Sequence, residues 1–303
     1  MSATADLILE RRRARRRLAF WRIVAIVALV VAAFAVIPRV AAPITGDHVA
    51  RIRIGGLILA DPHRAAMLHR IAKDDSIKAL MVDINSPGGS VAGSEALYEN
   101  LRAVAAKKPV VAVMSEVAAS GGYITALAAD HIVARGNTLT GSIGVLAETP
   151  NVAGLLDKIG VSFITVKSKP LKAEPSMTSP PAPGAIEAER ALIDDSYAWF
   201  KGLVAERRGI TGAALEDDSD GRAFTGRQAL KRGLIDAIGG EGKARDWLAQ
   251  KHGIARDMAV RDYDWHTSGL PWPLSSVGRS LASLLLPDRP VVYQGPRLYA
   301  VVQ

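Results

Sequence analysis

The residues best suited to chemistry in this chain are a serine and several glycines. Ser120 stands between a strand-like apolar segment and a helix-like one, and Gly121 follows it directly. A second small-residue corner, which contains Gly88 and Gly89, occupies the same kind of position earlier in the chain. A serine hydroxyl becomes a nucleophile when a base takes its proton and hydrogen-bond donors hold the oxyanion that forms. Because glycines leave backbone N–H groups accessible, we interpret Ser120 as a candidate nucleophile and Gly88, Gly89 and Gly121 as candidate oxyanion or substrate-binding residues.

Each corner alone is typical of an ordinary strand-to-helix turn, and only their joint placement favours a catalytic site. The base for Ser120 is left open by the residues themselves. The chain has no cysteine and six histidines, of which His131 is nearest to Ser120 in sequence. His131 begins a strand-like run, however, and this position favours a capping or solvent-facing role over that of a base. Lysine is the other known partner of a catalytic serine, provided that its amine is largely neutral.

Three lysines are candidates for that base. Lys167, Lys169 and Lys172 stand where a strand-like segment enters a proline-rich stretch, so that a lysine there could fold back over the edge of a sheet. The pattern does not choose among the three, and each also fits a solvated surface lysine.

Other chemistries find little support in the sequence. The acidic clusters at 194–195 and 216–218 have no matching ligand set, so we expect no metal site. The glycine corners fit neither a Walker loop nor a dinucleotide fingerprint, and we expect no cofactor. Of the formal net charge of +8, five charges come from residues 1–22 alone. Since the remainder is only mildly basic, with no aromatic-interleaved basic stripe, we expect no nucleic-acid binding.

The elements that must position these residues alternate along the chain. Strand-like segments at 49–59, 79–84, 109–114 and 131–134 alternate with helix-like segments at 61–73, 91–105 and 122–129. Alternation at this spacing predicts βαβ units on a mostly parallel sheet, whose ligands collect at the carboxyl ends of the strands. Both glycine corners fall at such ends. Further on we expect strands at 142–147 and 161–166, and helices near 152–158, 185–208, 226–232 and 241–252.

The N-terminus predicts a membrane anchor. Residues 23–38 are nearly all apolar, and residues 18–21 extend the run if Arg22 directs its charge toward the interface. Arginines precede the run, so the positive-inside rule keeps the basic tail, residues 1–17, in the cytoplasm. We expect an uncleaved single-pass helix at 18–38 in the inner membrane, a linker at 39–48 and a catalytic domain on the extracytoplasmic side. A cleaved signal peptide is the alternative.

Four short motifs, in their order and spacing, resemble the Ser-Lys peptidases of the signal peptide peptidase A family. They are the segments 85–90 (NSPGGS), 119–123 (ASGGY) and 140–145 (TGSIGV), and the run at 224–236 that contains FTGRQAL and GLID. Lys172 lies between the third and the fourth. The resemblance covers about residues 49 to 250.

The resemblance implies a fold like that of the crotonase and Clp protease superfamily, with Ser120 as nucleophile and a lysine as general base. The family often carries Gly-Lys-Tyr-Lys-Asp at the base, whereas this chain has SKPLKAE at 168–174. That correspondence assigns the base to Lys172 and makes Lys169 a neighbour without a catalytic role. It also implies that Ser142 orients the lysine amine. Family members of this short form assemble into ring-like or bowl-like oligomers, so we expect a homo-oligomer.

The sequence therefore predicts a membrane-anchored serine endopeptidase with its peptidase domain at 49–252, followed by an extension at 253–303 of unassigned role. Remnant signal peptides are the substrates that the resemblance implies, and lipid contacts the anchor. Two alternatives stay open. One is a crotonase-type acyl-CoA hydrolase or isomerase on the same fold, and the other is a non-catalytic membrane scaffold that binds exported peptides.

Overall fold

The computed structural model describes residues 17, 20–25, 27–28, 46–265 and 299–301. The chain forms two separate units, and the described residues of the first are a short helical stretch at its N-terminal end. Within the described residues, no helix combines the length and apolar character needed to cross a membrane. Most of the anchor predicted at 18–38 lies outside these residues.

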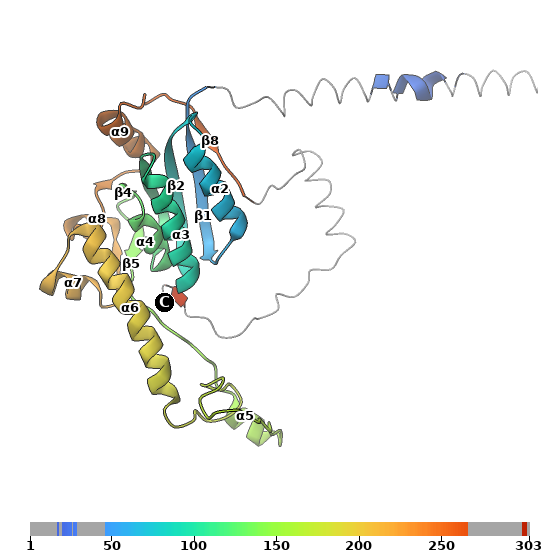
Figure 1. Cartoon of the computed structure of the whole chain (residues 1–303), viewed down its shortest axis with the longest axis vertical. Helices are drawn as coiled ribbons and strands as arrows, with labels where there is room; N and C mark the ends of the chain where they lie inside the picture. Colours follow the sequence, from blue (N-terminus) through green and yellow to red (C-terminus); the bar gives the residue numbers. More distant parts are fainter. Residues whose placement is uncertain (1–16, 18–19, 26, 29–45, 266–298, 302–303) are drawn as a thin grey trace, which may run out of the picture. The chain divides into compact units, whose positions relative to one another are not determined.

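A single β-sheet organises the second unit (Figure 1). Six of its strands follow one another in the order β6-β5-β3-β2-β1-β8, while β4 pairs with β3, β7 with β4, and β9 with β2. All these pairs are parallel except β5 with β6 and β2 with β9. The predicted α/β class with a mostly parallel sheet is confirmed. The strands are β1 (His48–Ile58), β2 (Ile77–Ser90), β3 (Val110–Ala119), β4 (His131–Ala134), β5 (Leu139–Gly141), β6 (Ala223–Thr225), β7 (Ala237–Ile238), β8 (Val260–Asp262) and β9 (Tyr299–Val301).

The helices begin and end largely where local signals predict. Asp61 caps the first helix of this unit through bonds from the N–H groups of His63 and Arg64, and a proline follows it. Gly209 ends the longest helix in a left-handed conformation, with φ of 67°. The helices are α2 (Pro62–Lys73), α3 (Val91–Ala105), α4 (Gly121–Leu127), α5 (Ala153–Lys158), α6 (Ala185–Arg208), α7 (Gly212–Asp218), α8 (Gly226–Lys231) and α9 (Glu241–His252).

The core divides into two layers because side chains alternate along each buried strand. In β2, Leu80, Val82 and Ile84 belong to a cluster with residues of α2, α3 and α4. The intervening Ala79 and Met81 belong to a second cluster, which also contains Ala244 and Leu248 of α9. Helices therefore cover both faces, as a parallel sheet requires, and α2 and α3 lie side by side on one of them (Figure 1).

Three local predictions were wrong. No strand forms at 161–166, where Ile164 and Val166 are each 94% exposed and no neighbouring strand pairs with them. The strand expected at 142–147 lies earlier in the chain, as β5. It ends at Gly141, and the next residue, Ser142, has a left-handed conformation. The segment 85–90 is not a turn, since β2 continues through it to Ser90. The strands β8 and β9 lie in the segment 253–303, whose role the sequence left unassigned.

Candidate active site

Ser120 occupies a strained corner between β3 and α4. Its backbone has φ of 54° and ψ of −117°, a combination that a residue with a Cβ atom rarely adopts. Two hydrogen bonds hold it there: its N–H donates to the carbonyl of Gly141 at 2.8 Å, and its own carbonyl accepts from the N–H of Ile124 at 2.9 Å. Strain of this kind costs about 1–3 kcal/mol and is concentrated at functional sites.

The hydroxyl of Ser120 is buried and unsatisfied. The residue is 0% exposed, and its Oγ has no hydrogen-bond partner among the described residues. A buried hydroxyl left in this state costs about 1–3 kcal/mol. Since an alanine would avoid that cost, an unpaired hydroxyl on a strained corner is the arrangement expected of a nucleophile that awaits its base.

The glycine corner of β2 lies directly beside this serine. The strands β2 and β3 pair until Ser86 faces Ala118, two residues before Ser120. A Cβ atom on Gly121 would stand 3.1 Å from the Cα of Gly88 and 3.1 Å from the N of Gly89. The structure thus brings together the two glycine motifs that lie more than thirty residues apart in the sequence.

The predicted oxyanion donors are not equivalent. The N–H of Gly88 already donates to Ser86 Oγ at 3.1 Å, and that hydroxyl donates in turn to the carbonyl of Gly56 at 2.6 Å. Gly121 is the first residue of α4, so its N–H has no acceptor within the helix. Between Gly88 and Gly121, the local geometry therefore favours Gly121 as the donor. Ser86 is a residue that the sequence did not single out.

Beyond Ser86 the edge of β2 that faces β3 is occupied by a short strand from the C-terminal part of the chain. β9 pairs antiparallel with β2, with Val301 opposite Gly88, Ala300 opposite Gly89 and Tyr299 opposite Ser90. This edge, next to Ser120, therefore accepts extended backbone by strand addition. The sequence offered no signal for it, because strand pairing over such a separation depends on the folded sheet.

Ser142 lies close to Ser120 through the pairing of their strands. β5 pairs with β3 so that Gly141 faces Ala119. Ser142 directly follows Gly141, and Ser120 directly follows Ala119. Ser142 is 7% exposed and has φ of 48°. Ser120, Ser142 and Ala173 are the non-glycine residues with positive φ in the described part of the chain. Two of these are predicted site residues, and the third follows Lys172.

The structure does not bring the candidate lysines to Ser120. Lys172 is exposed, and its N–H donates to the carbonyl of Lys169 at 3.1 Å in a tight turn. Lys169 is exposed as well. Lys167 forms an ion pair with Glu174, with 2.5 Å between Nζ and Oε1. No lysine amine within the described ranges bonds to Ser120 Oγ.

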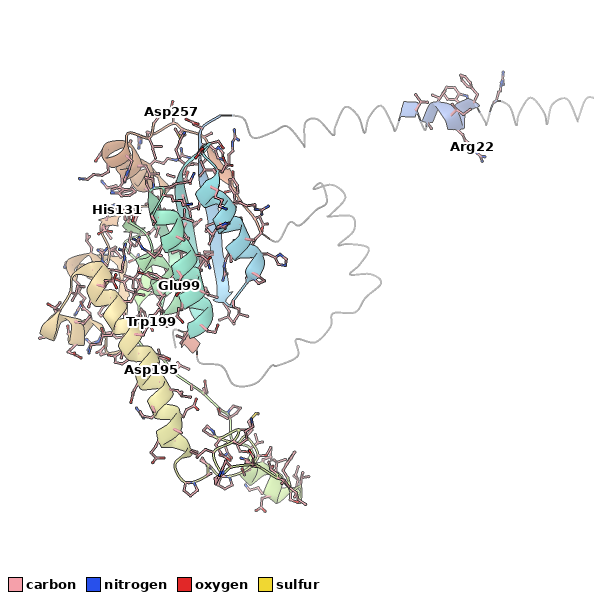
Figure 2. All side chains as sticks on the ribbon, viewed as in Figure 1. Arg22, Glu99, His131, Asp195, Trp199 and Asp257 are labelled. Atoms are coloured by element: carbon pink, nitrogen blue, oxygen red, sulfur yellow. The ribbon has the colours of Figure 1, made fainter. Side chains whose placement is uncertain are left out.

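His131, labelled in Figure 2, begins β4 and lies far from the candidate nucleophile along the sheet. It pairs with Val111 near the beginning of β3, whereas Ser120 follows the end of that strand. The eight residue-to-residue steps from Val111 to Ala119 span roughly 26 Å. Its ring stacks on Trp247 with centroids 4.9 Å apart, and its Nδ1 lies 3.7 Å from Asp236. These contacts give His131 a structural role.

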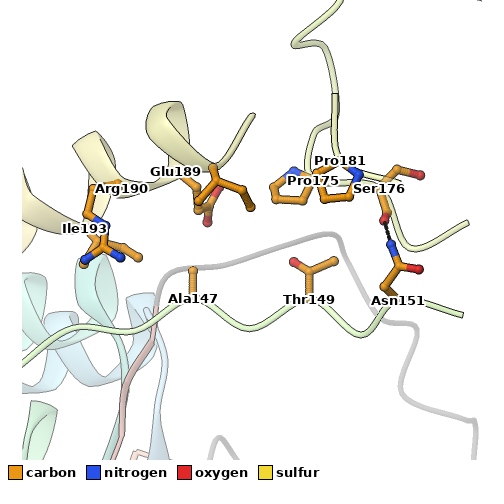
Figure 3. A pocket seen from close by; sticks show the side chains of 10 residues that line it. Ala147, Thr149, Asn151, Pro175, Ser176, Pro181, Glu189, Arg190 and Ile193 are labelled. Carbon is orange, nitrogen blue, oxygen red and sulfur yellow. Dashed lines mark hydrogen bonds between the residues drawn. The ribbon is translucent and has the colours of Figure 1, made fainter. Parts of the chain in front are cut away.

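A pocket of about 310 Å³ lies between the segment that precedes α5 and the start of α6 (Figure 3). Its walls come from residues 147–151, from the proline-rich stretch and from the first part of α6, where Glu189 and Arg190 line it. Asn151 donates to the carbonyls of Ser176 and Ser179, at 3.2 and 2.8 Å. The proline-rich stretch is thus tied to the chain that precedes α5.

Family models match this chain over the same residues that build the site. The model of peptidase family S49 matches residues 102–255, and the Clp protease model matches residues 60–138. A solved structure of a ClpP1 point mutant from Listeria monocytogenes aligns with 19% identity and a TM-score of 0.42, covering 63% of this chain and 91% of its own.

Three curated relatives share more of the sequence. A Synechocystis protein named as a protease is 38% identical over 72% of this chain and 79% of its own length. The chloroplastic serine protease SPPA of Arabidopsis thaliana is 34% identical over 78% of this chain and 37% of its own length. An Enterococcus faecium protein named as a signal peptide peptidase is 33% identical over 67% of this chain and 59% of its own length. The S49 model covers the strained serine, and the Clp protease model covers both that serine and the glycine motif of β2. The chain belongs to peptidase family S49 and is a serine peptidase.

Proposed function

We propose that this protein is a serine endopeptidase that uses Ser120 as nucleophile and Lys172 as general base. The observation that carries the proposal is the hydroxyl of Ser120, which is fully buried, held on a strained corner and unpaired among the described residues. A buried hydroxyl in that state can pair with a base that another segment of the protein supplies.

The proposed reaction gives each of these groups one role. The neutral amine of Lys172 takes the proton of Ser120, and Oγ attacks the carbonyl carbon of the peptide bond. The oxyanion accepts a bond from the N–H of Gly121, and the C–N bond then breaks as Lys172 returns the proton to the leaving amine. A water molecule, deprotonated by Lys172, hydrolyses the acyl ester and releases a carboxylic acid and free Ser120. Ser142 orients the amine between these steps.

The edge of β2 is the proposed place for the substrate backbone. β9 occupies this edge as an antiparallel strand opposite 88–90. A substrate peptide in the same position would run past Ser120 with its carbonyl groups beside the N–H groups of the glycine motif. Strand addition relies on backbone hydrogen bonds, so it suits substrates of varied sequence. Remnant signal peptides fit this description, and the name of the Enterococcus faecium relative supports them.

A second copy of the chain is the proposed source of the base. Lys172 lies on an exposed segment, and close to it Phe163, Ile164 and Val166 are 60%, 94% and 94% exposed. Adjoining exposed apolar side chains of this kind mark an interaction surface. We infer that the surface packs against a neighbouring subunit and delivers Lys172 there. The predicted helix at 18–38 would anchor the assembly in the inner membrane, with the peptidase domain on the extracytoplasmic side.

The experiment that tests the proposal compares two buried serines. Ser120→Ala is expected to lower kcat for an unstructured peptide by about 10⁴-fold or more, with the fold unchanged by circular dichroism. Ser219→Ala is the matched control, because Ser219 Oγ is also buried and without a partner among the described residues but lies at the ordinary end of α7. Full activity in Ser120→Ala would disprove the proposal.

A further inference from the structure

The segment that carries Lys172 has almost no apolar core to hold it. α5 has no buried residue, and residues 161–173 are exposed except for the half-buried Lys167. Hydrophobic burial fixes most loops of this size in place. Here the conformation must depend on polar contacts, and one carboxylate makes several of them.

Glu174 gathers the chain on both sides of Lys172. Its Oε1 lies 2.5 Å from the Nζ of Lys167, while its Oε2 accepts hydrogen bonds from the N–H groups of Ser176 at 3.1 Å and Ala182 at 3.2 Å. The side chain of Glu174 is 5% exposed and that of Lys167 is 20% exposed. One buried carboxylate thus joins a residue before Lys172 to two residues after it.

The backbone between these contacts makes a tight turn that displays Lys172. The N–H of Lys172 donates to the carbonyl of Lys169, and Ala173 adopts φ of 59° before the chain reaches Glu174. Left-handed conformation at an alanine costs about 1 kcal/mol or more, so surrounding contacts must impose it. The pair Lys167–Glu174 closes the base of this turn.

We propose that the ion pair of Lys167 with Glu174 is a clamp that positions Lys172 for proton transfer, which makes both of its members positioning residues of the proposed dyad. The inference rests on the proposed function. It also explains why Lys167, although it lies near Lys172 in the sequence, is not the base. Lys167 is bound in the ion pair, and the hydrogen bonds from Lys167 and from the N–H of Ala182 keep the pKa of Glu174 below its ordinary value. Lys172 is left free to serve as the base.

A double-mutant cycle on kcat and KM tests the clamp. Lys167→Met and Glu174→Gln are each expected to lower kcat by about 10- to 100-fold, because a displaced general base loses that much. KM should stay within about two-fold, since the substrate edge at 88–90 lies on a different element. The double variant should be no slower than either single variant, because the two residues act as one unit. Lys167→Arg keeps the ion pair and should restore most of the activity.

The matched control is the pair Lys201–Glu216, which has the same 2.5 Å separation and bridges α6 and α7. Lys201→Met with Glu216→Gln should leave kcat unchanged. Additive losses in the cycle, or wild-type kcat in Glu174→Gln, would overturn the proposal. A rise in KM with unchanged kcat would also overturn it.

A readout without activity separates this proposal from the proposed function. Glu174→Ala should speed hydrogen exchange at the N–H groups of Ser176 and Ala182, which donate to Glu174 in the folded chain. Lys172→Ala should leave the same amides protected. If the wild-type protein hydrolyses no peptide, the proposed function fails whatever the exchange shows. Unchanged exchange in Glu174→Ala would contradict the clamp even if the protein is an active peptidase.

Discussion

Gly121 packs so closely against Gly88 that a methyl group on Gly121 would be crowded by the backbone of β2. A Cβ atom on Gly121 would lie 3.1 Å from the Cα of Gly88 and would collide with the Oγ of Ser94. The approach of these two glycines is what sets the corner that carries Ser120 against the strand that receives the substrate.

Gly121→Ala should therefore abolish peptide hydrolysis at a modest cost in stability. The added methyl displaces the Ser94 hydroxyl and crowds the backbone of Gly88 and Gly89, and overpacking of this kind costs about 1–3 kcal/mol. The measurement is kcat together with the urea midpoint of unfolding. Gly202→Ala is the control, because Gly202 lies within α6 and a Cβ atom there would have no neighbouring atom within 4 Å. Equal activity in the two variants would show that the contact is unimportant for catalysis.

Removal of β9 should increase activity toward short peptides. Residues 299–301 pair with the edge of β2 that the substrate is proposed to use, so they compete with it. If the states with β9 paired and unpaired are equally populated, deletion of residues 299–303 raises kcat/KM about two-fold. The increase is larger if the paired state predominates. Deletion of residues 302–303 alone is the control. Lower activity after the longer deletion would indicate that β9 supports the site and does not compete for it.

Mixing two inactive variants should restore hydrolysis. Ser120→Ala retains Lys172, and Lys172→Ala retains Ser120, so a site that takes one residue from each subunit is rebuilt in a mixed assembly. With random exchange of subunits at equal amounts, about a quarter of the sites regain both groups. Activity of the mixture is measured after co-refolding. If no activity returns while both variants assemble normally, the base comes from the same chain as the serine.

The stability of the fold should depend on pH through Asp236. Burial raises the pKa of Asp236, but hydrogen bonds and charge from Arg208 and the N–H of Ile132 outweigh it, and the pKa lies below its ordinary value. A depressed carboxyl pKa stabilises the folded state above about pH 4, and this contribution is lost as pH falls through the folded value. Asp236→Asn should therefore cost about 1–3 kcal/mol at pH 7. Urea titrations at pH 7 and pH 3 should show the difference shrink, and an equal loss at both would contradict this account.

The sequence was most informative where local signals coincide with the sheet. α6 and α9 begin and end at the predicted residues, and β4 does so as well. The proximity of Ser120 to the glycine motif was predictable because carboxyl ends of parallel strands meet at one edge.

Predictions failed where apolar residues have no strand beside them. Residues 161–166 have the composition of a strand, but in the described part of the chain nothing pairs with them. The pairing of β9 with β2 and the contacts of Glu174 link residues whose partners no local pattern reveals. For the same reason, a family resemblance and not the spacing of residues predicted the lysine base. In the single chain, Lys172 does not bond to Ser120 Oγ.

The most direct measurement of the central claim is the site of a covalent adduct. The purified full-length protein is treated with a fluorophosphonate, and the modified residue is identified by mass spectrometry while peptide hydrolysis is followed in parallel. We predict one adduct, on Ser120, whose formation matches the loss of hydrolysis, and no adduct in Ser120→Ala. An adduct on another residue that accounts for the lost activity, or full hydrolysis by protein labelled at Ser120, would contradict the assignment of Ser120 as the nucleophile.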